Sequence, residues 1–131
     1  MKTLIVEDEF TSRLLLQRLL QGYGECHVAV NGKEAIQAFQ AAMECDQPYN
    51  LICLDIMMPE MDGQEARKQI RAMEEAKGTL SSHGVKIVMT TALCDSKNLF
   101  TAYANLCDGY LVKPIDKVKL LDHLRKLELI Q

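Results

Sequence analysis

The residues best suited to chemistry in this 131-residue chain are acidic, basic and hydroxyl side chains that directly follow short apolar runs. Glu7 and Asp8 follow the first run, Asp55 follows the third, Thr91 comes at the end of the fourth, and Lys113 comes after the fifth. If the runs are parallel strands of an open α/β sheet, their carboxyl ends meet at one crevice, which is where such sheets bind ligands. The sequence therefore predicts one shared site.

The three carboxylates expected in this crevice would repel one another unless a cation neutralised them. A cluster of oxygen ligands with open coordination positions suits Mg²⁺ or Mn²⁺, and Mg²⁺ often bridges to phosphate. A neighbouring lysine can pair with a phosphoryl oxygen, and a hydroxyl can bond another. A carboxylate nucleophile, a metal ion, Lys113 and Thr91 together predict phosphoryl chemistry.

Five apolar runs have the length and composition of buried strands. They are Thr3–Val6, Cys26–Val30, Leu51–Leu54, Val85–Met89 and Tyr110–Val112. Strands that are apolar on both faces, each followed by a helix, are typical of a doubly wound parallel sheet that helices cover on each side. The connection over residues 74–84 precedes a strand, so we expect it at the amino edge of the sheet, away from the predicted site.

Apolar residues recur at spacings of three and four between the predicted strands, as in Ile36, Phe39 and Met43, and this periodicity predicts helices. Asp95 and Asp116 are the expected N-caps of the fourth and fifth helices. The inner face of the fourth helix would carry Leu99, Tyr103 and Leu106. The fifth helix has apolar residues around more than one face, which fits either a core stripe with an apolar tail or a partner surface.

The composition limits the class of protein. The formal charge of −3 argues against a dedicated nucleic-acid binder, which usually carries a basic stripe. No apolar run approaches the ~20 residues that span a bilayer, and the first residues lack the pattern of a signal peptide, so we expect no membrane partner and a cytoplasmic location. The five cysteines are odd in number and form no C-x-x-C pair, which argues against a disulfide framework or a zinc site.

Four segments carry a family resemblance because their order and spacing agree with one fold. They are Leu4–Asp8, Leu54–Gly63, Thr91–Ala92 and Gly109–Pro114. Together they closely resemble the response-regulator receiver domain, the CheY-like family of two-component signalling. The resemblance implies one stand-alone receiver over residues 1–131 with no output domain. It also implies a flavodoxin-like (βα)5 fold whose parallel strands lie in the order 2-1-3-4-5.

The resemblance also implies roles at the metal and the acceptor. Asp55 corresponds to the phosphoacceptor. Asp8 corresponds to a direct Mg²⁺ ligand, and Glu7 acts mainly through metal-bound water. Met57 supplies its backbone carbonyl to the metal, so that role does not depend on its side chain.

Three further residues take roles from the same resemblance. Thr91 bonds the phosphoryl group after transfer, and Lys113 pairs with Asp55 or with its phosphoryl oxygens. Tyr110 corresponds to an aromatic switch that moves inward when Thr91 is drawn to the phosphate. The Lys113–Pro114 peptide bond is often cis in this family.

These roles imply a phosphorylation-controlled binding module. A sensor histidine kinase or a histidine phosphotransfer protein would supply the phosphoryl group, and an unidentified downstream protein would bind the fourth helix, fifth strand and fifth helix. We expect a monomer or weak dimer that does not bind nucleic acid directly and shows slow self-dephosphorylation at most. The apolar side chains of Met57 and Leu93 flank the path of attacking water, and we hypothesise that they slow this loss.

Three other functions are open at this stage. A Mg²⁺-dependent phosphatase acting through an aspartyl phosphate usually carries a second aspartate two residues after the nucleophile, where this chain has Met57. A receiver fold used as an unphosphorylated adaptor would be indicated by loss of an acidic residue or the lysine, and all are present. A flavin-binding protein would carry a hydroxyl- and glycine-rich loop after the first strand, which this chain lacks.

Overall fold

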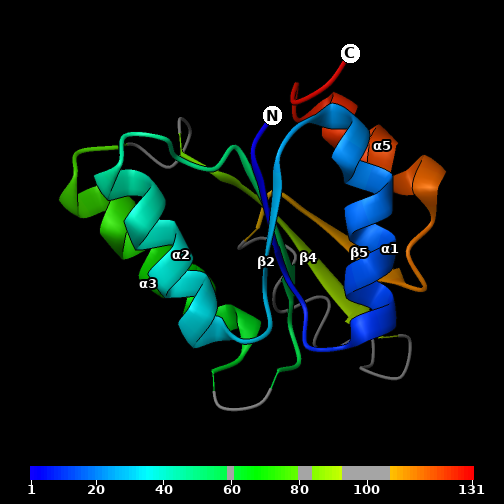
Figure 1. The fold of residues 1–131 in the computed structure, drawn as a ribbon, viewed down its shortest axis with the longest axis horizontal. Coiled ribbons are helices and arrows are strands. Elements are labelled where there is room, and N and C mark those ends of the chain that lie inside the picture. Colours follow the sequence, from blue (N-terminus) through cyan, green and yellow to red (C-terminus); the bar gives the residue numbers. More distant parts are fainter. Residues whose placement is uncertain (59–60, 80–83, 93–106) are drawn as a thin grey trace.

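A computed structural model of the chain describes residues 1–58, 61–79, 84–92 and 107–131. Its centre is a five-stranded sheet in the order β2-β1-β3-β4-β5, in which every neighbouring pair is parallel (Figure 1). This confirms the predicted fold class and strand order. The strands are β1 (Thr3–Val6), β2 (Cys26–Ala29), β3 (Leu51–Asp55), β4 (Lys86–Ala92) and β5 (Gly109–Lys113).

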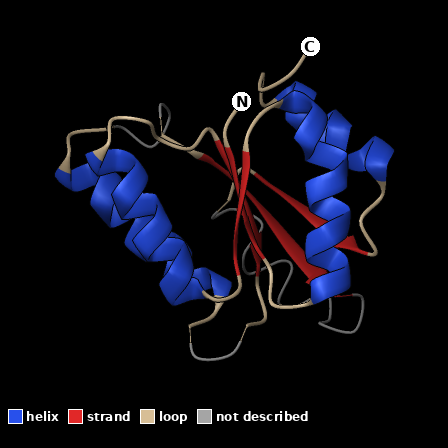
Figure 2. Cartoon of the chain, in the orientation of Figure 1, coloured by secondary structure: helices blue, strands red, loops and turns tan. Residues whose placement is uncertain are grey.

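Helices cover both faces of the sheet, α1 and α5 on one side and α2 and α3 on the other (Figures 1 and 2). The helices are α1 (Phe10–Leu20), the short 3₁₀ turn η1 (Gln21–Tyr23), α2 (Gly32–Glu44), α3 (Gly63–Ala76) and α5 (Lys117–Lys126). The predicted fourth helix, with its cap Asp95, falls on residues 93–106, which lie outside the described residues. No helix among the described residues is long and apolar enough to cross a membrane.

Three of the helices begin at a side chain that caps them. Asn31, Asp62 and Asp116 each accept a hydrogen bond from a backbone N–H in the first turn of α2, α3 and α5, at 2.8–2.9 Å. Such a bond satisfies one of the N–H groups that a helix leaves free at its start. The predicted cap at Asp116 is confirmed.

The core consists of two compartments separated by the sheet. Alternate residues of β3 point to opposite faces, as in any strand. Ile52 and Leu54 pack with α2 and α3, whereas Leu51 and Cys53 pack with α1 and α5. The apolar residues of the last helix and its tail belong to the second compartment, so the structure favours a core stripe over a partner surface there. They are Leu120, Leu121, Leu124, Leu127, Leu129 and Ile130.

A partly buried ionic network joins α3 to the amino ends of β4 and β5. Arg71 Nη1 donates to Glu74 Oε1 at 2.7 Å and to the carbonyl of Val85 at 2.8 Å, and its Nη2 donates to Asp108 Oδ2 at 3.1 Å. Glu74 Oε2 accepts from the backbone N–H of Val85 at 2.7 Å, and Asp108 Oδ2 accepts from that of Ile87 at 2.8 Å. The network therefore fixes where both strands begin.

The fourth strand extends further than the apolar pattern predicts. β4 continues past the apolar run, which ends at Met89, through Thr90 and Thr91 to Ala92, so Thr91 lies at the end of the strand as predicted. The polar residues stay in the strand because they pair with β5 in register, Thr90 opposite Leu111. Thr90 also pairs with Asp55 of β3, and β-branched threonine is itself a residue that strands favour.

Candidate functional site

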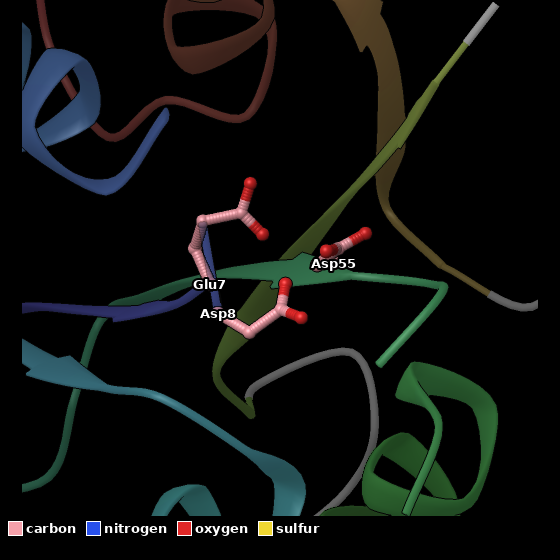
Figure 3. A group of neighbouring side chains, drawn as sticks. All are labelled: Glu7, Asp8 and Asp55. Carbon is pink, nitrogen blue, oxygen red and sulfur yellow. The ribbon is translucent and has the colours of Figure 1, made fainter. Parts of the chain in front are cut away.

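Three carboxylates meet where β1 and β3 end (Figure 3). Glu7 directly follows β1, and its backbone N–H donates to the carbonyl of Ala29 at 3.0 Å, which prolongs the pairing with β2. Asp55 is the last residue of β3 and stands opposite Thr90 of β4. One oxygen of Glu7, one of Asp8 and one of Asp55 all lie within 4.8 Å of one another.

Among the described residues, Lys113 is the only basic residue whose side chain forms ion pairs with these carboxylates. It is the last residue of β5, and its peptide bond to Pro114 is cis, as the resemblance implied. Its Nζ donates to Glu7 Oε1 and lies 3.3 Å from Asp55 Oδ2. Glu7 is fully buried and Asp55 is 4% exposed, so these contacts form largely out of water.

The protein environment opposes the charge on Asp55. The pKa of Asp55 is raised from an ordinary 3.8 to about 8, mainly by burial and further by the neighbouring carboxylate of Glu7, whereas Lys113 lowers it. For Lys113, burial lowers the pKa, but its contacts with Glu7 and Asp55 outweigh burial and raise it overall. Three carboxyl groups thus face the single ammonium group of Lys113, which forms ion pairs with two of them.

The donor set fits a hard divalent cation. Glu7 Oε2 is buried and has no hydrogen-bond partner among the described residues, which is unfavourable for a carboxylate oxygen. Asp8 is exposed and opens the cluster to solvent. Three converging carboxylates with one exposed member offer oxygen ligands and room for bound water, which is the coordination that Mg²⁺ prefers.

Met57 lies beside the carboxylate of Asp55. Its backbone N–H donates to Asp55 Oδ1 at 3.2 Å, while its side chain is 54% exposed. The second apolar residue of the water-access hypothesis, Leu93, falls outside the described residues.

Thr91 is on β4, which pairs with β3, and Tyr110 is on β5, which pairs with β4. Thr91 is 3% exposed, and its hydroxyl donates to the carbonyl of Ala92 at 3.4 Å. It directly follows Thr90, the residue that pairs with Asp55. Tyr110 is on β5 and is 37% exposed. Thr91 therefore lies near the carboxyl end of β4, whereas Tyr110 is the second residue of β5, near the amino end of that strand.

One residue at the site was not predicted from the sequence. Arg13 of α1 reaches back past the start of its helix and donates from Nη1 to the backbone carbonyl of Glu7 at 3.0 Å. A signal for it exists, because a basic residue close to a helix N-terminus opposes the helix dipole. Such a residue calls for a compensating acceptor nearby, and here that acceptor directly precedes Asp8.

A separate cavity of about 450 Å³ lies at the opposite edge of the sheet, between the ends of α2 and α3. Its described lining includes Met43, Asp46, Lys77 and Lys86. The two lysines are offset by two carboxylates that also line the cavity, Asp46 and Glu74, so the cavity favours no ligand charge. None of the clustered carboxylates lines it, and the chemistry is therefore not in the cavity.

Comparison with known proteins agrees with this geometry. A family model described as the response regulator receiver domain matches residues 3–125. The transcriptional regulatory protein SrrA of Staphylococcus aureus is 33% identical over 125 residues, which is 95% of this chain and 46% of that protein. The chain spans less than half the length of the curated relatives that it matches first.

Two solved structures have the same fold. Chemotaxis protein CheY4 of Vibrio cholerae is 28% identical with a TM-score of 0.75, covering 96% of this chain and 97% of that one. The receiver domain of the histidine kinase CKI1 from Arabidopsis thaliana, solved with Mg²⁺ and BeF₃⁻, is 26% identical with a TM-score of 0.77. That match covers 97% of this chain and 89% of the other.

Proposed function

The chain belongs to the response regulator receiver domain family, and on that premise we propose that Asp55 is its phosphoacceptor, working with Mg²⁺ or Mn²⁺. Receiver domains are in general phosphoacceptor switches and not classical enzymes. The observation that carries the proposal is the position of Asp55, in a cluster with Glu7 and Asp8 and 3.3 Å from the ammonium group of Lys113. A carboxylate, a lysine and a cation-binding cluster are the parts that phosphoryl transfer requires.

The proposed donor is a phosphohistidine on a sensor histidine kinase or a histidine phosphotransfer protein. A carboxylate oxygen of Asp55 attacks the phosphorus, a P–O bond forms, and the P–N bond to the donor imidazole breaks. The electron pair of the broken bond stays on the imidazole nitrogen, which takes up a proton. Lys113 holds its positive charge where negative charge gathers on the phosphoryl oxygens. Asp8, Asp55, the backbone carbonyl of Met57 and, through bound water, Glu7 would hold a divalent cation, which would supply further positive charge and favour ionised Asp55.

The acyl phosphate then changes a protein-binding surface. In this proposal Thr91 bonds the phosphoryl group and Tyr110 moves inward, which biases a two-state surface. Tyr110, Val112 and Val118 on β5 and α5 are 37%, 38% and 66% exposed, and this apolar surface supports binding of a downstream protein there. The fourth helix of the proposed face lies outside the described residues. We take residues 1–131 as one cytoplasmic receiver unit that acts through protein contact.

The test measures phosphorylation and its dependence on Asp55. The protein is incubated with Mg²⁺ and acetyl phosphate, and intact mass shows whether one phosphoryl group is added. Asp55→Asn should add none, and Asp122→Asn, which changes an exposed carboxylate on α5, should behave as wild type. Labelling of Asp55→Asn to the wild-type level, or no labelling of the wild type with either Mg²⁺ or Mn²⁺, would contradict the proposal. Repeated turnover of a generic phosphate ester would favour the phosphatase alternative.

A further inference from the structure

The backbone of Glu7 is held from two sides. Its N–H donates to the carbonyl of Ala29, and its carbonyl accepts from the guanidinium group of Arg13 at 3.0 Å. The next residue is Asp8, the exposed member of the acidic cluster. Asp8 therefore starts from a backbone position that one strand neighbour and one helix side chain fix together.

The position of Arg13 is unfavourable unless its contact compensates. Arg13 is the fourth residue of α1, whose first turn contains no acidic side chain and whose N-cap, Glu9, makes no side-chain capping bond. A cation near the positive end of a helix is opposed by the macrodipole. The guanidinium group meets the Glu7 carbonyl and lies 5.6 Å from the ring centroid of Phe10, so it is held in one orientation.

We propose that Arg13 is a positioning residue for the cation site, because it fixes the Glu7 carbonyl and thereby the placement of Asp8. This inference rests on the proposed function, since it concerns the same cluster. Arg13 itself acts through the backbone and touches no carboxylate oxygen in the described contacts. Its role is to keep two ligand side chains within reach of the third, on Asp55.

The positive charge of Arg13 and its hydrogen bond should affect cation affinity in opposite directions. A positive charge near a cation site weakens cation binding by repulsion, so if charge dominated, removing Arg13 would tighten binding. If positioning dominates, removing it weakens binding, because the cluster must be ordered by the cation itself. Residues that orient metal ligands change metal affinity about 10–100-fold when they are mutated. The sign of the effect therefore separates the two roles.

The experiment is calorimetric titration of the full chain with Mg²⁺. Arg13→Met should weaken binding about tenfold, the lower end for residues that orient ligands. Arg13→Lys keeps a donor and should recover most of the affinity. Arg18→Met removes the same charge from the same helix at an exposed position with no described contact to the site, and it should bind as wild type. Thermal melting without Mg²⁺ checks that each variant is folded at the titration temperature.

The outcomes distinguish this inference from the proposed function. Wild-type affinity or tighter binding in Arg13→Met overturns the positioning role and leaves Asp55 phosphorylation standing. Weakening by Arg13→Lys equal to that by Arg13→Met overturns it too, and so does equal weakening by Arg18→Met. If the wild type bound neither Mg²⁺ nor Mn²⁺, the proposed function would fail first. If Arg13→Met does not fold, Arg13→Lys and Arg13→Gln give the same test. Both keep a hydrogen-bond donor on a shorter side chain, and only the lysine keeps the positive charge.

Discussion

Removing Arg71 should show how much the ionic network of Arg71, Glu74 and Asp108 contributes to the free energy of unfolding. Arg71→Met keeps an unbranched apolar stem but removes the guanidinium donors to Glu74, Asp108 and the carbonyl of Val85. The side chain of Glu74 is 6% exposed and that of Arg71 is 20% exposed. Without Arg71, the carboxylate of Glu74 therefore cannot readily reach water.

The expected loss follows from the contacts that remain. Breaking a buried ion pair by removing one partner destabilises a protein by about 3–5 kcal/mol. Glu74 and Asp108 each keep one backbone N–H donor, from Val85 and Ile87, which places this case at the lower end. We therefore expect Arg71→Met to lose about 3 kcal/mol, a decrease of roughly 10 °C in Tm for a chain of this size.

Urea unfolding followed by circular dichroism measures this loss directly. Arg125→Met is the matched control, because Arg125 also pairs three residues away, with Asp122, but both side chains are about half exposed. Its loss should stay below about 0.5 kcal/mol. Adding Glu74→Gln to Arg71→Met removes the stranded charge and should restore about 1–2 kcal/mol. A loss below about 1 kcal/mol for Arg71→Met, or no recovery in the double variant, would refute the reasoning.

Three further changes test the site and the core. Met57→Asn should shorten the lifetime of the phosphorylated state several-fold, because an amide beside Asp55 can hold attacking water; loss of phosphate at the wild-type rate would remove the hypothesis. Burial raises the pKa of the Cys53 thiol to about 12. At neutral pH, iodoacetamide should therefore alkylate the exposed Cys45 but not Cys53, and Cys53 should react only after urea has unfolded the chain. An added Cβ at Gly63 would lie 2.4 Å from the backbone oxygen of Asp55. Gly63→Ala should therefore lower the free energy of unfolding in urea by about 1–3 kcal/mol and also weaken Mg²⁺ binding. If neither quantity changed, the close approach would be contradicted.

The elements and the acidic cluster were predictable because few rules determine them. Apolar runs separated by helical periodicity specify a parallel α/β sheet, and the carboxyl ends of its central strands must meet. Glu7 and Asp55 come immediately after such runs, so their convergence follows from topology alone. The cap at Asp116 was predictable for a similar reason, since capping depends on one residue type at a local boundary.

Contacts between distant side chains were not predictable in this way. Arg71 and Asp108 are 37 residues apart and meet only in the folded chain, where α3 lies beside the amino ends of β4 and β5. Arg13 bonds a backbone carbonyl, and every residue has one, so its partner leaves no trace in the sequence. The apolar run alone would end β4 at Met89, whereas Thr90 pairs as a strand residue beyond it.

The division of the core by the sheet determines how changes in the interior combine. Phe39 fills the compartment under α2 and α3, and Leu120 fills the one under α5. Close-packed interiors adjust a volume change only through direct neighbours, and the paired backbone of β1, β3 and β4 stands between these two sets. Core substitutions can therefore be designed separately for the two compartments. Within one compartment they need to be chosen jointly, whereas the stability effects of substitutions on opposite sides of the sheet should add.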